Sequence, residues 1–181
     1  MYRNLKILKT EDEIRARVRE LGQLITQKFK ATSGAAGNSE PVAICILNGS
    51  FVFYSDLIRA IDLDLTCEFL GVSSYKDQKV SSGEVKVTLD LTAPLEGKDV
   101  LLIEDLVDSG LTMNYLIETI KARKPKSLTT VSLLLKPKAL KIKCPIDFVG
   151  FEVPNDFVVG YGIDFAGEYR NLPYLGVLPK N

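Results

Sequence analysis

One stretch in the middle of the chain constrains the fold more than any other: an apolar run, two adjacent acids, and a short polar loop leading into a helix. Residues 100–103 are apolar and of strand length, Glu104 and Asp105 follow, and residues 112–123 have helical apolar spacing. Strand patterns alternate with helix patterns on both sides of this stretch. Such alternation predicts an α/β fold, in which helices flank a largely parallel sheet and ligands bind beyond the carboxyl ends of the strands.

The remaining elements follow from the same periodicities. Thr10 and Glu13 form a capping-box pattern that predicts a helix start, with an apolar face at Ile14, Val18, Leu21, Ile25 and Phe29. A second helix is predicted at residues 51–61, and strands at 42–47, 61–69, 85–91, 127–135, 148–151 and 157–161. Residues 31–40 and 73–83 are predicted loops, the first of them flexible. A chain of 181 residues suits one domain, and its aromatic-rich tail predicts a small flap beside the main sheet.

Composition excludes several kinds of chemistry. The chain has no histidine, which excludes Ser-His-Asp and Cys-His nucleophile systems as well as HExxH zinc sites and two-His iron sites. Acid–base work therefore falls to carboxylates, Lys, Tyr or Cys, and any metal ion is expected to be a hard one held by oxygen atoms. Lys plus Arg and Asp plus Glu both number 23, so no net positive field favours nucleic acid or anionic lipid.

Cysteine usage and hydropathy predict the compartment. No apolar run is long enough for a signal peptide or a membrane span. The three cysteines, Cys45, Cys67 and Cys144, lack CxxC spacing, and the first two lie in apolar runs that predict buried, reduced thiols. We therefore expect a cytoplasmic protein with no membrane partner.

The loop after the two acids has the features of a phosphate site. Gly110 lets the backbone approach a ligand, and Ser109 and Thr112 add hydroxyl donors at the start of a helix, where free N–H groups favour anions. Two acids just upstream would repel phosphate unless they hold Mg²⁺ or bind sugar hydroxyls, which indicates a phosphorylated sugar as ligand. The alternative interpretation is a helix cap and a turn with no ligand. Neither a Walker A loop nor a GxGxxG dinucleotide motif is present.

Residues 100–112 together resemble the signature of the type I phosphoribosyltransferase family: an apolar run, two acids, then a D-[ST]-G-x-T loop. Further segments are similar to the hypoxanthine–guanine branch of that family, and the resemblance covers nearly the whole chain from about residue 40. It implies the family's α/β fold with a small hood formed by the N-terminal segment and residues from about 136 to 181. It also implies a magnesium-dependent enzyme that joins phosphoribosyl pyrophosphate to hypoxanthine or guanine, and a homodimer or homotetramer.

The resemblance implies a role for each matching residue around the sugar. Asp108 is the expected general base, at N7 of the purine. The 5′-phosphate is expected to bind the loop of Asp108, Ser109, Gly110, Leu111 and Thr112. Glu104 and Asp105 are expected to bind the ribose hydroxyls and Mg²⁺, with Asp164 near a second metal ion and the base.

The resemblance also implies the residues of the purine and pyrophosphate sites. Lys136 is expected to donate to the O6 atom of the purine, Phe157 to stack on the base, and the backbone of Val158 to read its edge. Pyrophosphate is expected to bind Asn48, Gly49 and Arg170. Ser74 and Tyr75 are expected to belong to a mobile catalytic lid.

Two departures from the family pattern and several alternatives stand beside this interpretation. Asn48 replaces a frequent Lys, and Leu111 replaces a frequent polar or basic residue. By default Phe157 would be a core residue, Lys136 a solvated loop end, and Asp164 a turn cap. Two alternative functions remain. One is a regulator on the same fold that binds nucleic acid, and the other is an enzyme that prefers xanthine or a pyrimidine.

Overall fold

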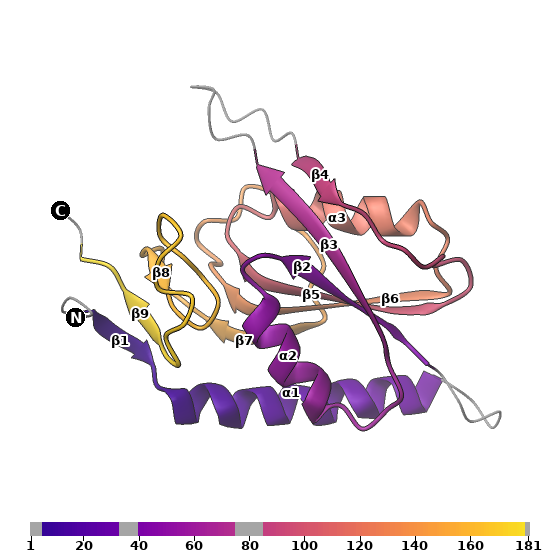
Figure 1. Cartoon of the computed structure of the whole chain (residues 1–181), viewed down its shortest axis with the longest axis horizontal. Coiled ribbons are helices and arrows are strands. Elements are labelled where there is room, and N and C mark those ends of the chain that lie inside the picture. The colour runs from indigo at the N-terminus through magenta and orange to yellow at the C-terminus, as the bar shows by residue number, and fades with distance from the viewer. Residues whose placement is uncertain (1–4, 33–39, 75–84, 180–181) are drawn as a thin grey trace.

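A computed structural model of the chain describes residues 5–32, 40–74 and 85–179. Six strands form the main sheet in the order β4-β3-β2-β5-β6-β7 (Figure 1). All neighbours pair in parallel except β4, which pairs with β3 in the antiparallel sense. The strands are β2 (Val42–Leu47), β3 (Thr66–Ser74), β4 (Val85–Leu89), β5 (Asp99–Val107), β6 (Ser127–Leu135) and β7 (Phe148–Glu152). The predicted α/β fold with a largely parallel sheet is confirmed.

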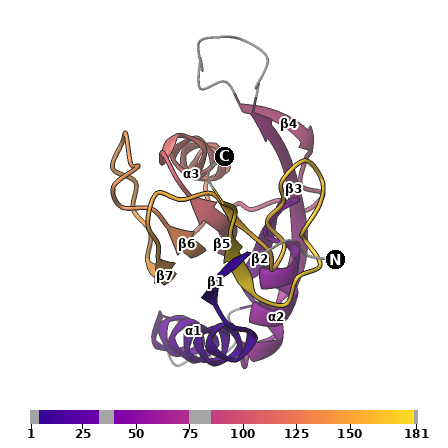
Figure 2. The same ribbon diagram turned by 90° about the vertical axis from the view of Figure 1, so that its left-hand side faces the viewer.

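Helices cover both faces of this sheet (Figure 2). Helices α1 (Glu11–Thr32) and α2 (Phe51–Ala60) pack on one face with Ala43 and Cys45 of β2, and α3 (Leu111–Lys121) packs on the other with Val42 and Ile44. Neighbouring residues of β2 thus point to opposite helix layers, because side chains alternate along a strand. A strand buried on both faces reads as a continuous apolar run, which is what residues 42–47 show.

A second, three-stranded sheet lies beside the main one and joins the two ends of the chain (Figure 1). In it β1 (Lys6–Lys9) and β8 (Val158–Val159) flank β9 (Leu175–Val177), both in the antiparallel sense. The division into one domain with a hood stays a prediction. Within the range predicted for the hood, β7 pairs with β6 in the main sheet, whereas β8 and β9 pair with β1.

The predicted capping box of α1 is confirmed. The Thr10 N–H donates to Oε2 of Glu13 at 2.9 Å, and the Glu13 N–H donates to Oγ1 of Thr10 at 3.3 Å. The predicted apolar face is buried at all five positions, which are Ile14, Val18, Leu21, Ile25 and Phe29. The helix continues to Thr32, so it includes the first two residues of the loop predicted at 31–40. The rest of that expected loop, residues 33–39, lies outside the described residues.

Two strand predictions were wrong at their boundaries. The strand expected at residues 61–69 begins only at Thr66, whose N–H donates to the Pro41 carbonyl where pairing with β2 starts. Residues 61–65 instead lead out of α2, and the Asp62 N–H donates to Oγ1 of Thr26. The strand expected at 100–103 continues to Val107, because β6 extends alongside and pairs with it.

The cysteine prediction was half right. Cys45 is fully buried, and burial raises the pKa of its thiol to about 11, so it stays protonated. Cys67 is exposed, because the alternation of β3 points it away from the core. All three cysteines are free. In the described part of the chain, no helix combines the length and the apolar character needed to span a bilayer.

Candidate active site

Most of the predicted site residues follow strands of the parallel sheet. Asn48 and Gly49 come after β2, Asp108 after β5, and Lys136 after β6. The carboxyl ends of parallel strands meet at one edge of the sheet, which is where open α/β proteins bind ligands. Side chains about 60 and 30 residues apart in the chain therefore come together at one edge.

Glu104 and Asp105 lie inside β5, not beyond it. Glu104 is buried, and its Oε2 atom has no hydrogen-bond partner among the residues that the structure describes. Burial raises the pKa of Glu104 well above its usual range, and the neighbouring Asp105 carboxylate raises it further. Burial also raises the pKa of Asp105, although hydrogen bonds with Glu104 and with the Leu106 N–H, and to a lesser extent the charge of Arg170, oppose the shift. This is a site where two carboxylates are poorly compensated by protein groups alone.

The acidic pair fits a hard divalent cation. An unpartnered buried oxygen and two adjacent carboxylates are the oxygen donors that Mg²⁺ prefers. Within the described ranges, no group of three or more His, Cys, Asp or Glu side chains gathers to hold an ion, so Asp164 does not complete a three-carboxylate cage. Mg²⁺ commonly binds one or two carboxylates and takes its other ligands from water and substrate phosphates.

The loop of residues 108–112 forms the start of α3. Gly110 precedes the helix in the left-handed conformation with φ of 83°, and a Cβ atom there would lie 2.7 Å from the Ile142 carbonyl oxygen. Only glycine fits this position without strain. In the described structure the N-cap Gly110 has no side-chain cap hydrogen bond, and the interpretation of this loop as a cap and turn stays an alternative. Ser109 Oγ makes only a long contact of 3.4 Å with the Leu111 N–H.

Lys136 and Asp108 form an ion pair across the ends of β5 and β6. The Nζ atom of Lys136 lies 3.1 Å from Oδ2 of Asp108. The Lys136 side chain is 7% exposed and that of Asp108 is 51% exposed, so the pair opens to solvent only at the carboxylate. The default interpretation of Lys136 as a solvated loop end is therefore wrong. A buried ammonium retains two further N–H donors for a ligand.

Phe157 stands out from the surface beside a second aromatic ring. Its side chain is 53% exposed, and its ring meets that of Phe165 edge to face at a centroid distance of 5.4 Å. The default interpretation of Phe157 as a core residue is wrong. Val158, the next residue, is buried in β8. The chain thus presents a half-exposed aromatic ring of the kind that stacks on planar ligands.

The loop after β2 makes an unusually close contact with the acidic pair. The peptide bond between Leu47 and Asn48 is cis. A Cβ atom at Gly49 would lie 1.7 Å from Oδ2 of Asp105, so the Gly49 backbone packs against that carboxylate and leaves no room for a side chain. A Cβ atom at Gly162 would lie 2.3 Å from the Gly49 carbonyl oxygen. Gly162 was not among the predicted site residues. It directly follows the strand predicted at residues 157–161.

Asp164 and Arg170 bind each other close to these glycines. Arg170 Nη2 lies 2.7 Å from Oδ1 of Asp164, and Arg170 Nη1 donates to the Gly162 carbonyl at 2.7 Å. Asp164 Oδ2 also accepts the Gly167 N–H at 2.8 Å, so the turn-cap interpretation of Asp164 is confirmed. Of the predicted lid residues, Ser74 ends β3, and Tyr75 lies outside the described residues.

Comparison with known proteins agrees with this geometry. The phosphoribosyl transferase domain family matches residues 11–166, and the chain belongs to this family. It is 50% identical over 173 residues to the hypoxanthine-guanine phosphoribosyltransferase of Bacillus subtilis, covering 96% of this chain and 92% of that protein. It is 40% identical to the hypoxanthine phosphoribosyltransferase of Escherichia coli, covering 97% of this chain and 96% of that protein.

Solved structures give the same relationship. A hypoxanthine-guanine phosphoribosyltransferase of Bacillus anthracis, 40% identical, superimposes with a TM-score of 0.88 over 97% of this chain and 100% of that one. The hypoxanthine phosphoribosyl transferase of Trypanosoma cruzi, 39% identical, gives 0.91 over 99% and 94%. The chain also spans 26% of the longer bifunctional protein TilS/HprT of Listeria monocytogenes, at 47% identity.

Proposed function

We propose that this protein transfers the 5-phosphoribosyl group from phosphoribosyl pyrophosphate to a 6-oxopurine, hypoxanthine or guanine, and releases pyrophosphate. The observation that carries the proposal is the buried Lys136 ammonium beside the half-exposed Asp108 carboxylate, at the mouth of a glycine-lined helix start. The Lys136 ammonium can donate to a purine oxygen, and the Asp108 carboxylate can accept from a purine N–H. The free N–H groups at the helix start can bind a phosphate. The identities of 40–50% with hypoxanthine and hypoxanthine-guanine phosphoribosyltransferases support it.

The reaction breaks the bond from C1′ of the sugar to pyrophosphate and forms a bond from C1′ to a purine ring nitrogen. Asp108 accepts the proton that the purine loses at N7, a role that typically contributes about 10²–10⁴-fold to the rate. Lys136 donates one N–H to Asp108, and its two other N–H groups are available to donate to O6 of the purine. The exposed face of Phe157 stacks on the base, and the Val158 backbone reads its edge.

The sugar end of the substrate lies against β5 and α3. The backbone N–H groups of residues 109–112 receive the 5′-phosphate, and the Ser109 hydroxyl makes only a long contact of 3.4 Å with one of them, the Leu111 N–H. Glu104 and Asp105 hold Mg²⁺ and the ribose hydroxyls. When bound, Mg²⁺ neutralises the charge on the leaving pyrophosphate. Gly49, Asn48 and Arg170 bind pyrophosphate, and Arg170 retains N–H donors beyond its contacts to Gly162 and Asp164.

The family likeness also supports a second metal site, a lid and an oligomer. Asp164 lies near the base and a second metal ion, and Ser74 and Tyr75 belong to a lid that excludes water. The chain works as a homodimer or homotetramer, and its three free cysteines suit the reducing cytoplasm in which we place it.

A panel of bases tests the proposed function. The full chain is assayed with phosphoribosyl pyrophosphate and Mg²⁺ against hypoxanthine, guanine, xanthine, adenine and a pyrimidine, and nucleotide and pyrophosphate are measured. We expect turnover with hypoxanthine or guanine, little with adenine, and none after chelation of Mg²⁺. Turnover of xanthine or the pyrimidine alone would contradict the substrate class. A salt-sensitive complex with nucleic acid in place of turnover would favour the regulator instead.

A further inference from the structure

The segment of residues 160–172 reaches the proposed pyrophosphate site through backbone contacts. Gly162 rests on the Gly49 carbonyl, and Gly49 rests on the Asp105 carboxylate. Arg170 is tied to Gly162 twice, since its carbonyl accepts the Gly162 N–H at 2.9 Å and its guanidinium donates to the Gly162 carbonyl at 2.7 Å. The positions of Gly49 and Arg170 therefore depend on where Gly162 lies.

Tyr161 immediately precedes this glycine and is held in an unusual conformation. Its φ is 46°, in the left-handed region that side chains other than glycine rarely adopt. Its ring is 6% exposed, and its N–H donates to the Leu172 carbonyl at 2.9 Å. A residue remains in such a conformation only when its surroundings hold it there, and such residues cluster at functional sites.

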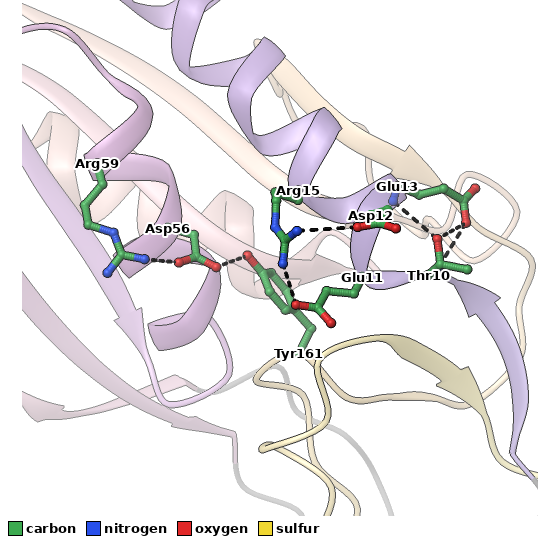
Figure 3. A network of polar contacts seen from close by, with 8 residues as sticks. All are labelled: Thr10, Glu11, Asp12, Glu13, Arg15, Asp56, Arg59 and Tyr161. Atoms are coloured by element: carbon green, nitrogen blue, oxygen red, sulfur yellow. Dashed lines mark hydrogen bonds and ion pairs between the residues drawn. The ribbon is translucent and has the colours of Figure 1, made fainter.

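The Tyr161 hydroxyl supplies one such restraint (Figure 3). It donates to Oδ2 of Asp56 on α2 at 2.6 Å, and Asp56 also forms an ion pair with Arg59. Burial, followed by the hydrogen bond to Asp56, raises the pKa of Tyr161, so the hydroxyl stays protonated and keeps donating. The carboxylate is a charged acceptor, and hydrogen bonds to charged groups are about twice as strong as those between neutral groups.

The hydrogen bond joins the two segments that meet at Gly49. Helix α2 begins directly after the Asn48–Ser50 turn, so Asp56 belongs to the same rigid element that Gly49 leads into. Tyr161 is adjacent to Gly162, whose Cα lies close to the Gly49 carbonyl. A restraint from Tyr161 to Asp56 thus sets the spacing between Gly162 and the loop after β2.

We propose that Tyr161, through its hydrogen bond to Asp56, is a positioning residue that holds Gly162 and Arg170 against the pyrophosphate-binding loop at Gly49. This inference rests on the proposed function, because it assigns the contacted residues to pyrophosphate. Tyr161 is proposed to act through Gly162 and Arg170, without direct contact with substrate or metal ion. Its effect falls on the binding of phosphoribosyl pyrophosphate and not on the purine.

The test replaces Tyr161 by phenylalanine, which keeps the ring and removes the hydroxyl. We expect the KM for phosphoribosyl pyrophosphate to rise about tenfold, which corresponds to the loss of one hydrogen bond to a charged group. The KM for hypoxanthine is expected to stay within about twofold, because Lys136 and Phe157 are not tied to this hydrogen bond. Affinity for pyrophosphate, measured as product inhibition, is expected to fall in parallel.

Tyr54→Phe is the matched control. Tyr54 is a buried tyrosine of α2, 4% exposed, and its hydroxyl donates to the Ala43 carbonyl at 3.1 Å. Its removal costs a buried hydrogen bond without touching residues 160–172, so thermal unfolding shifts while the KM for phosphoribosyl pyrophosphate stays unchanged. Equal KM changes in Tyr54→Phe and Tyr161→Phe would assign the effect to general stability and overturn the proposal.

Two variants of Asp56 separate the hydrogen bond from the ring. Asp56→Asn keeps an acceptor oxygen and is expected to keep the KM for phosphoribosyl pyrophosphate near that of the wild type. Asp56→Ala removes the acceptor and is expected to reproduce Tyr161→Phe. An unchanged KM in both Asp56→Ala and Tyr161→Phe would overturn the proposal. Absence of turnover in the wild-type protein would instead overturn the proposed function, so the two failures are distinguishable.

Discussion

Replacement of Glu104 by glutamine is expected to stabilise the metal-free protein. The Oε2 atom of Glu104 is buried without a partner in the described structure, and burial raises the pKa of this carboxyl. Glutamine has nearly the same shape, carries no charge, and offers an NH₂ group that can donate to Asp105. An unsatisfied buried polar group costs about 1–3 kcal/mol. Relief of that cost in a chain of this length corresponds to a rise in Tm of about 2–4 °C per kcal/mol.

The sign of the pH dependence follows from the raised pKa of Glu104. A carboxyl whose pKa is higher in the folded than in the unfolded protein favours folding below its unfolded pKa, here near 4.5. That contribution disappears as the pH rises through the folded value. Wild type and Glu104→Gln should therefore have similar Tm values at about pH 5, and the variant should gain a growing advantage towards about pH 8.

The assay is thermal unfolding in EDTA across this pH range, repeated with Mg²⁺ and phosphoribosyl pyrophosphate. Wild type is expected to gain stability from the added ligands, and Glu104→Gln to gain less. Glu68→Gln is the control, because Glu68 is also buried but accepts hydrogen bonds from the Thr92 N–H and hydroxyl at 3.0 and 2.8 Å. This control should lower the Tm. A Glu104→Gln variant less stable than wild type in EDTA at about pH 8 would refute the reasoning.

Three further substitutions test individual residues of the site. Asp108→Asn should lower kcat about 10²-fold or more with little change in the affinity for Mg²⁺–phosphoribosyl pyrophosphate, and a kcat within about threefold of wild type would exclude Asp108 as the base. Lys136→Met should reduce kcat/KM for hypoxanthine and guanine far more than for adenine, because the site's buried donor is matched to O6; an equal loss for all three bases would contradict this role. Gly110→Ala should weaken binding of phosphoribosyl pyrophosphate and lower the Tm, since its Cβ meets the Ile142 carbonyl. Gly97→Ala, also left-handed but with nothing within 4 Å, should cost backbone strain alone, and equal Tm losses for the two would exclude the steric effect.

Local signals in the sequence were sufficient for most of the fold. The capping box at Thr10 and Glu13 and the apolar stripe of α1 depend on contacts within a few residues, and both appear as predicted. The continuous apolar run of β2 likewise reflects burial on both faces of a parallel sheet. Elements of this kind are encoded by neighbours in the chain, so periodicity finds them.

Strand boundaries depended on partners that periodicity does not reveal. Glu104 lies in β5 opposite Ser132 of β6, although a buried acid normally argues against a strand interior. In β3, the sequence alternation predicts that Cys67 is buried, but Cys67 is exposed. The burial of Glu104 and the exposure of Cys67 both depend on which segments pack against each strand. A single sequence does not reveal those contacts.

The contact between Gly49, Gly162 and Asp105 shows why part of the site was missed. A glycine marks a place where a side chain is excluded, yet its sequence context does not say which atoms exclude it. Gly49 excludes a side chain because a carboxylate from β5 lies there, and Gly162 because the Gly49 carbonyl lies there. These segments are separated by more than 50 residues and meet only after the sheet has assembled. A substitution that adds a single methyl group at Gly162 would place it against the Gly49 carbonyl and push apart the same loops that the hydrogen bond between Tyr161 and Asp56 connects.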